Sequence, residues 1–269
     1  MKNSKKMKDF SFGYDNKVLQ SCILTTARYD FNVYEKRILY KLVELSQPFI
    51  FANKNEDPSN EKICVKGDKI KVRMTYKELL TLNDLNNHKR IRTALESLQH
   101  KTLQYQDSTS GWKSVSIISD IKTTSRSSDL VFNVKKEFWD IMMDFREWGM
   151  SYDAEVASSF ESVYTMRLYE IICWQSWGYT IDLAALRQML CLECKYKNPS
   201  DLINRVLGSA KRELDSKSEL SFDWKANKSG RAITSVTLTP VKTRSENPKE
   251  INISEKMISP CQTNNAADN

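Results

Sequence analysis

The spacing of apolar residues predicts a regular order of elements in the N-terminal half of the chain. A first helix is indicated by apolar residues at helical spacing, namely Tyr34, Ile38, Leu42 and Leu45. Pro48 is expected to end it, because proline cannot donate the next backbone hydrogen bond. The expected elements, in order, are a helix at residues 30–47, a strand at 69–74, a short helix with a capping box at 75–80, a longer helix at 88–100, a hairpin of 102–106 with 112–121, a strand at 130–134 and a helix at 135–145.

The C-terminal half repeats this order. We expect a helix at residues 162–174, a strand at 179–182, a short helix at 183–190, a longer helix at 199–214 and two strands at 220–225 and 232–241. A short helix, a turn, a longer helix and a two-stranded wing make up a winged helix-turn-helix domain. A short echo supports the repeat, because Tyr34–Arg37 and Tyr164–Arg167 open the first helix of each half with the pattern Tyr-x-x-Arg.

We therefore expect an α+β fold of two tandem winged-helix domains with a pseudo-twofold relation. The expected parts are a flexible basic arm (residues 1–15), an N-terminal winged-helix domain (16–145), a C-terminal winged-helix domain (146–242) and a disordered polar tail (243–269).

The longer helix of the C-terminal half has two distinct faces. Its apolar face consists of Leu202, Ile203, Val206, Leu207, Ala210 and Leu214 and is expected to pack in the core. The opposite face carries Asn204, Arg205, Gly208, Lys211 and Arg212. Arginine and asparagine can bond to guanine and adenine edges, and glycine permits close approach of a phosphate. This helix is predicted to read DNA, although an ordinary solvated surface would show the same charges.

Two further basic segments are candidate DNA contacts. Lys89, Arg90 and Arg92 begin the longer helix of the N-terminal half, where point charges favour phosphate contact over base reading. On the same helix, Ile91, Leu95 and Leu98 are expected to face inward. More cations lie just upstream, at Lys66, Lys69, Lys71, Arg73 and Lys77. In the C-terminal wing, Lys228 and Arg231 flank a turn that can reach phosphate or the minor groove. A solubilising charge run and a polar hairpin end remain the alternatives.

Composition agrees with a polyanionic partner. The 269 residues include 41 basic and 34 acidic ones, and the excess charge lies mainly in the N-terminal half. No apolar run approaches the ~18 residues of a membrane span, so no membrane partner is expected. The N-terminus has no apolar signal segment, and the six cysteines are expected to be reduced thiols in the cytoplasm.

Several catalytic classes are excluded by residue counts. The seven glycines are too far apart for either standard nucleotide-binding loop. The histidines, His88 and His100, do not form the pair needed by zinc proteases or DNA-nicking relaxases. Cys191 and Cys194 form a single CxxC without further ligands, which leaves a redox switch as the residual alternative to two ordinary thiols. We expect no catalytic residues, no metal site and no cofactor, and hence no enzyme.

Short sequence pieces in a fixed order carry a family resemblance from Asn16 to Lys242. They are Asn16–Leu19, Leu24-Thr25, Glu35–Ile38, Tyr164–Ile171, Leu183–Leu190, Ala210–Leu214 and Gly230-Arg231. In this order and spacing, the chain resembles the iteron-binding, theta-type plasmid replication initiator proteins. The positions that match the recognition helix of that family are Asn204, Arg205, Lys211 and Arg212.

The resemblance implies a tandem winged-helix protein of the bacterial cytoplasm that binds double-stranded DNA. Its second domain would read direct repeats (iterons) at the plasmid origin, and its first would contact DNA less specifically and form a dimer with a second copy. Monomers would open the origin and recruit the host initiator and replicative helicase, while dimers would repress the initiator's own gene. The main alternative is a winged-helix transcriptional repressor that binds an inverted repeat.

Overall fold

The computed structural model describes residues 17–52, 60–81, 87–107, 111–123, 128–145, 149–174 and 178–243. The predicted arm at residues 1–15 and the predicted tail beyond Thr243 lie outside these ranges. The elements of the first half are β1 (Lys17–Ser21), α1 (Cys22–Thr26), α2 (Val33–Phe51), β2 (Ile63–Lys66), β3 (Lys69–Thr75), α3 (Tyr76–Leu79), α4 (His88–Leu98), β4 (Thr102–Asp107), β5 (Gly111–Ser116), β6 (Ile118–Thr123), β7 (Asp129–Val134), α5 (Lys136–Met142), β8 (Gly149–Asp153) and α6 (Ala154–Ser159).

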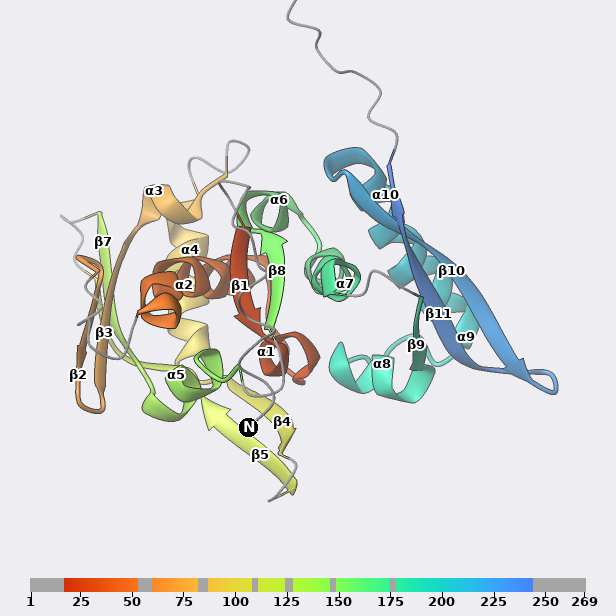
Figure 1. The fold of residues 1–269 in the computed structure, drawn as a ribbon, viewed down its shortest axis with the longest axis horizontal. Helices are drawn as coiled ribbons and strands as arrows, with labels where there is room; N and C mark the ends of the chain where they lie inside the picture. Colours follow the sequence, from red (N-terminus) through yellow and green to blue (C-terminus); the bar gives the residue numbers. More distant parts are fainter. Residues whose placement is uncertain are drawn as a thin grey trace, which may run out of the picture.

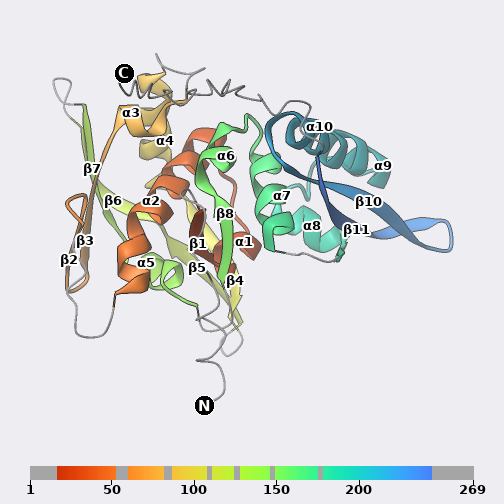
Figure 2. The same ribbon diagram turned by 45° about the horizontal axis from the view of Figure 1, so that its top comes forward.

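The second half has fewer elements. They are α7 (Val163–Trp174), β9 (Tyr179–Asp182), α8 (Leu183–Met189), α9 (Pro199–Leu202), the π-helical turn η3 (Ile203–Leu207), α10 (Gly208–Lys217), β10 (Leu220–Ser229) and β11 (Ala232–Lys242). Helix α7 lies between the elements of the two halves in both views (Figure 1, Figure 2).

The sheets confirm that one topology occurs twice. In the second half the strand order is β10-β11-β9, and in the first half β3, β7 and β6 are neighbours in the same way, with β2 added at the edge. Each unit therefore has a long helix (α2 or α7), a strand (β3 or β9), a short helix (α3 or α8), a longer helix (α4 or α9–η3–α10) and a hairpin (β6–β7 or β10–β11). This is the element order of a winged helix-turn-helix.

The wing of the first unit is not the hairpin that the sequence predicts. Strands β4 and β5 do pair, but the chain then enters a different sheet, where β6 pairs with β7. The change occurs at Ile117 and Ile118, which are both buried and so break the alternation of a single strand. The prediction of one strand over 112–121 is therefore wrong, and β4–β5 is an additional hairpin outside the winged-helix plan.

Helix α2 also differs from its prediction, because it continues through Pro48 to Phe51. A proline inside a helix leaves the carbonyl four residues earlier without its hydrogen bond. That residue is Glu44, which is exposed like Pro48 itself, so water can bind the carbonyl. The helix begins with a capping box in which the Asn32 side chain accepts from the backbone N–H of Glu35.

The pairing of β8 with β1 links residues at the predicted domain boundary to the start of the chain. The register runs from Lys17 opposite Asp153 to Ser21 opposite Gly149. Residues from 146 onward are predicted to belong to the C-terminal domain, whereas the structure pairs 149–153 with a strand that precedes α2. A Cβ at Gly149 would lie 2.7 Å from the Phe145 ring and 3.0 Å from a methyl group of Leu19 on β1, so this close packing favours glycine.

Candidate nucleic-acid interface

The segment α9–η3–α10 forms the longest helical surface of the second unit. It begins where the Asn198 side chain accepts from the backbone N–H of Ser200, with Pro199 in the first helical position. All six residues of the predicted apolar face are buried, namely Leu202, Ile203, Val206, Leu207, Ala210 and Leu214. The core prediction for this helix is therefore confirmed.

Asn204 and Arg205 lie on the exposed face of this helix, within the π-helical turn η3. Neither side chain makes a hydrogen bond or an ion pair within the described part of the chain. π-Helical turns are rare and often occur at functional sites. Arg212 is exposed as well, and its guanidinium donates to the Ser209 hydroxyl at 3.0 Å. These three side chains are accessible to a DNA base edge.

Lys211 and Gly208 lie closer to the hairpin than the sequence suggests. The Lys211 ammonium is 3.2 Å from the Asp223 carboxylate on β10 and 3.4 Å from that of Asp215. A Cβ on Gly208 would lie 4.0 Å from the Trp224 ring, which is ordinary contact. Both positions therefore face the junction between α10 and β10. The sequence pattern does not predict this contact between α10 and β10, because Gly208 and Trp224 belong to different elements.

The β10–β11 hairpin projects well beyond the rest of the molecule (Figure 1, Figure 2). Its turn requires Gly230, whose φ of +60° favours glycine. Lys228 and Arg231 lie on either side of this turn and are exposed, as is Lys225 nearer the body. A register shift between Asn227 and Lys228 bends the tip. The tip thus carries cations away from the core, as a DNA-contacting wing requires.

In the first unit, α4 presents the predicted basic residues on its exposed face. Lys89, Arg90 and Arg92 are exposed, while the predicted inward positions of this helix are buried. The Arg90 guanidinium donates to the Tyr34 hydroxyl at 3.3 Å, and Arg92 forms an ion pair with Glu96 at 3.0 Å. Both contacts are at the surface, where such pairs are weak and exchange readily with a phosphate.

Lys77 lies on α3 beside α4, whereas the basic residues on β3 are separated from α4 in space. Lys69, Lys71 and Arg73 are exposed on β3 and alternate with buried residues, of which Ile70 and Val72 are two. The helices cover the buried side of this sheet (Figure 1). The exposed cations of β3 therefore face away from α4, and the two sets of charges do not form one continuous surface.

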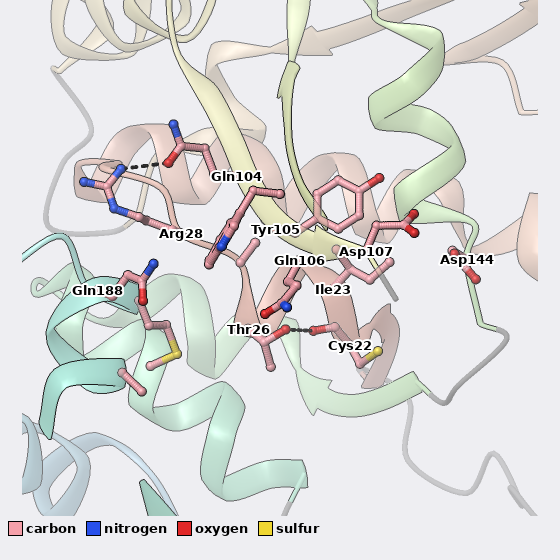
Figure 3. A pocket seen from close by; sticks show the side chains of 14 residues that line it. Cys22, Ile23, Thr26, Arg28, Gln104, Tyr105, Gln106, Asp107, Asp144 and Gln188 are labelled. Carbon is pink, nitrogen blue, oxygen red and sulfur yellow. Dashed lines mark hydrogen bonds between the residues drawn. The ribbon is translucent and has the colours of Figure 1, made fainter. Parts of the chain in front are cut away.

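A cavity of about 490 Å³ lies where α1 and β4 of the first half meet α8 of the second half (Figure 3). Arg28 lies at one side of it, donating to Gln104 at 3.0 Å and pairing with Glu193 at 2.9 Å. Thr26 donates to the carbonyl of Cys22 across the floor. Glutamine and aspartate side chains share the lining with aromatic and apolar ones, among them Tyr105, Trp112 and Met189, so the cavity has a mixed polar and apolar wall.

The CxxC pair lies at the end of α8. Cys191 is half-buried and Cys194 is exposed, and both are free thiols. Burial raises the pKa of the Cys191 thiol, which lowers its thiolate fraction. Among the described residues, no group of three or more His, Cys, Asp or Glu side chains could hold a metal ion. None of the helices that the structure describes is long and apolar enough to span a membrane.

Two models of protein families match the chain, and both describe initiator replication proteins. The model "Initiator Replication protein, WH1" matches residues 17–173, and "Initiator Rep protein, WH2" matches residues 182–240. No curated protein sequence matches the chain.

Two solved structures are similar to the chain. The Pi initiator protein in complex with iteron DNA has a TM-score of 0.64 at 14% identity, covering 85% of this chain and 98% of that chain. Domains 2 and 3 of RctB have a TM-score of 0.44 at 12% identity, covering 78% of this chain and 82% of that chain. At 14% identity, the first likeness supports the two-domain winged-helix fold.

Proposed function

The chain belongs to the family of initiator replication proteins with two winged-helix domains, and from that premise we propose that it binds direct-repeat (iteron) DNA at a plasmid origin and starts replication there. The observation that carries this proposal is the presence of two dissimilar exposed helix surfaces in one chain, each in a winged helix-turn-helix unit. The C-terminal helix exposes Asn204 and Arg205, which suit base edges, whereas α4 exposes Lys89 and Arg90, which suit phosphates.

The asymmetry of these surfaces favours direct repeats. A single chain with two different reading helices matches a DNA site without internal symmetry, and several copies in one direction would then form an array. A palindromic site requires two identical surfaces related by a twofold axis. The fold likeness to the Pi initiator, which was crystallised with iteron DNA, is consistent with the first arrangement.

The remaining steps of initiation are part of the same proposal. Bound copies bend the origin and assist opening of a neighbouring AT-rich segment, and they recruit the host initiator and replicative helicase. A dimer of the chain represses its own gene. The protein acts through binding energy in the bacterial cytoplasm, without a catalytic residue or cofactor of its own.

Selection of binding sites from a random pool of DNA duplexes tests this function. We expect the wild-type chain to enrich an asymmetric motif, because one molecule presents both surfaces to one repeat. Arg205→Ala should enrich a motif with reduced information at one or two positions, while Lys242→Ala, an exposed cation at the end of β11 opposite the hairpin tip, serves as the matched control. An inverted repeat as the dominant motif would instead identify a winged-helix repressor.

A further inference from the structure

The two units are joined by polar contacts that are deeply buried. The first helix of each unit, α2 and α7, contributes one arginine, and both arginines end the Tyr-x-x-Arg echo of the sequence. Arg37 is 4% exposed and Arg167 is 2% exposed. Burial of arginine is rare and is ordinarily accompanied by hydrogen bonds or ion pairs to the guanidinium, so these contacts have a specific role in the fold.

Arg37 of the first unit holds the segment that leads into the first helix of the second. Its Nε donates to the carbonyl of Ser158 at 2.9 Å, and its Nη2 donates to the carbonyl of Phe160 at 3.4 Å. These carbonyls lie at the C-terminal end of α6, which connects the first half to α7. The guanidinium also lies 5.3 Å from the centre of the Tyr34 ring.

Arg167 makes the reciprocal contact from the second unit. Its Nη2 donates to the carbonyls of Thr25 at 2.9 Å and Ala27 at 2.7 Å, which lie in the segment that leads into α2. Its Nη1 donates to the carbonyl of Met189 at 3.0 Å, at the end of α8. The guanidinium is 3.9 Å from the centre of the Tyr29 ring, close enough for a cation–π contact.

An ion pair between the same two helices adds to this arrangement. The Lys36 ammonium on α2 lies 2.5 Å from the Glu170 carboxylate on α7, and both side chains are fully buried. Lys36 also donates to the Tyr29 hydroxyl at 2.6 Å. Tyr40 of α2 donates to the carbonyl of Met166 of α7 at 3.3 Å. The interface thus consists of directional bonds as well as apolar contact.

Directional bonds restrict how the two helices can shift relative to each other. Apolar contacts can repack at a modest cost, whereas a planar guanidinium that donates to three carbonyls loses several bonds at once when it shifts. Each lost bond would leave a buried donor or acceptor unsatisfied. The interface therefore favours one relative placement of the units, and through them of α4 and α9–η3–α10.

We propose that Arg37 and Arg167 are positioning residues that fix the distance and rotation between the two DNA-reading helices, and thereby determine which spacing of contacts along the DNA the protein accepts. This proposal rests on the proposed function, because it treats both helices as DNA-binding elements. Adding one base pair between the two contacted segments moves them apart by about 3.4 Å and rotates them by about 35°. A rigid protein cannot follow such a change.

The test compares binding to duplexes that carry the selected motif with none, one, two or three base pairs inserted between its two halves. Arg167→Lys and Arg37→Lys retain the charge and remove the planar fork. Arg187→Lys is the matched control, because Arg187 donates to the carbonyls of Tyr196 and Lys197 within one unit. Each variant is first checked for folding by circular dichroism and thermal unfolding.

We expect a two-base-pair insertion to weaken wild-type and Arg187→Lys binding about tenfold or more, but to weaken Arg167→Lys or Arg37→Lys by only about threefold or less. If Arg167→Lys does not fold, Arg37→Lys alone decides the result. The proposal would be overturned if the folded arginine variants lost as much DNA affinity on insertion as the wild type does. That result would show that apolar packing alone fixes the relative placement of the units.

A second measurement does not depend on DNA binding. Small-angle X-ray scattering of the free protein should give a larger radius of gyration for Arg167→Lys than for wild type and Arg187→Lys, because the units separate and reorient. Identical scattering would contradict the positioning role. If the wild-type chain selects no DNA motif, the proposed function fails, and the scattering still decides whether the arginines hold the units together.

Discussion

Replacing Lys36 by methionine tests the energetics of the contact between α2 and α7. Lys36 and Glu170 are both fully buried and lie 2.5 Å apart, so the substitution leaves a carboxylate in the core without its counter-charge. Loss of one partner of a buried ion pair costs about 3–5 kcal/mol of unfolding free energy. For a chain of this size, that corresponds to a fall in Tm of roughly 6–20 °C.

The double variant Lys36→Met with Glu170→Met distinguishes the pair from its environment. Two apolar side chains of similar volume need no counter-charge, so this variant should recover most of the lost unfolding free energy. Lys136→Met, on α5 and in an ion pair at the surface with Asp140, should cost less than about 1 kcal/mol.

Urea denaturation monitored by circular dichroism measures the unfolding free energy of the wild type and of the three variants. A Lys36→Met variant as stable as the wild type would refute the reasoning, since it would mean that the buried Glu170 carboxylate has no free-energy cost without its counter-charge. A double variant that is as unstable as the single one would place the loss in side-chain packing instead of charge.

Three further predictions concern DNA binding and pH. Arg205→Ala should weaken binding to the selected motif by about 1–3 kcal/mol and relax its specificity, as measured by fluorescence anisotropy, whereas equal weakening on all sequences would indicate a phosphate contact. Removing Lys89 and Arg90 together should lower the slope of log K against log salt by about one to two, and an unchanged slope would exclude them as phosphate contacts. Burial raises the pKa of the Tyr40 and Tyr152 phenols well above the ordinary value, and a nearby carboxylate adds to the shift. Only the unfolded chain releases these protons near pH 10, so the unfolding free energy should fall as the pH rises above about 10, and less steeply in Tyr152→Phe.

Local patterns were sufficient for the elements that are amphipathic by themselves. The stripe from Leu202 to Leu214 and the inward positions of α4 are buried as predicted, because helical spacing directly determines which face meets the core. The capping box from Thr75 to Glu78 likewise begins α3 where the sequence places it.

Long-range pairing could not be predicted in the same way. The partner of β3 is β7, and the partner of β1 is β8, which lies more than a hundred residues away in the chain. Nothing in the spacing near Ile117 and Ile118 says which sheet each strand joins, so the sequence assigned the wing to the wrong hairpin.

The buried arginines illustrate the same limit at the site. Arg167 bonds to carbonyls about 140 residues away, and a charged residue in a helix ordinarily predicts a solvated face. The one available signal was the Tyr-x-x-Arg echo, which indicates that the position recurs in both units without showing what it contacts.

Footprinting of the wild-type protein on the DNA that flanks its gene, at physiological salt, tests the central claim most directly. The account predicts protection of several regularly spaced direct repeats, each with contacts in two successive turns of the helix, and loss of this protection with Arg205→Ala. Protection of a single inverted repeat over a promoter, or protection that is independent of sequence, would contradict it.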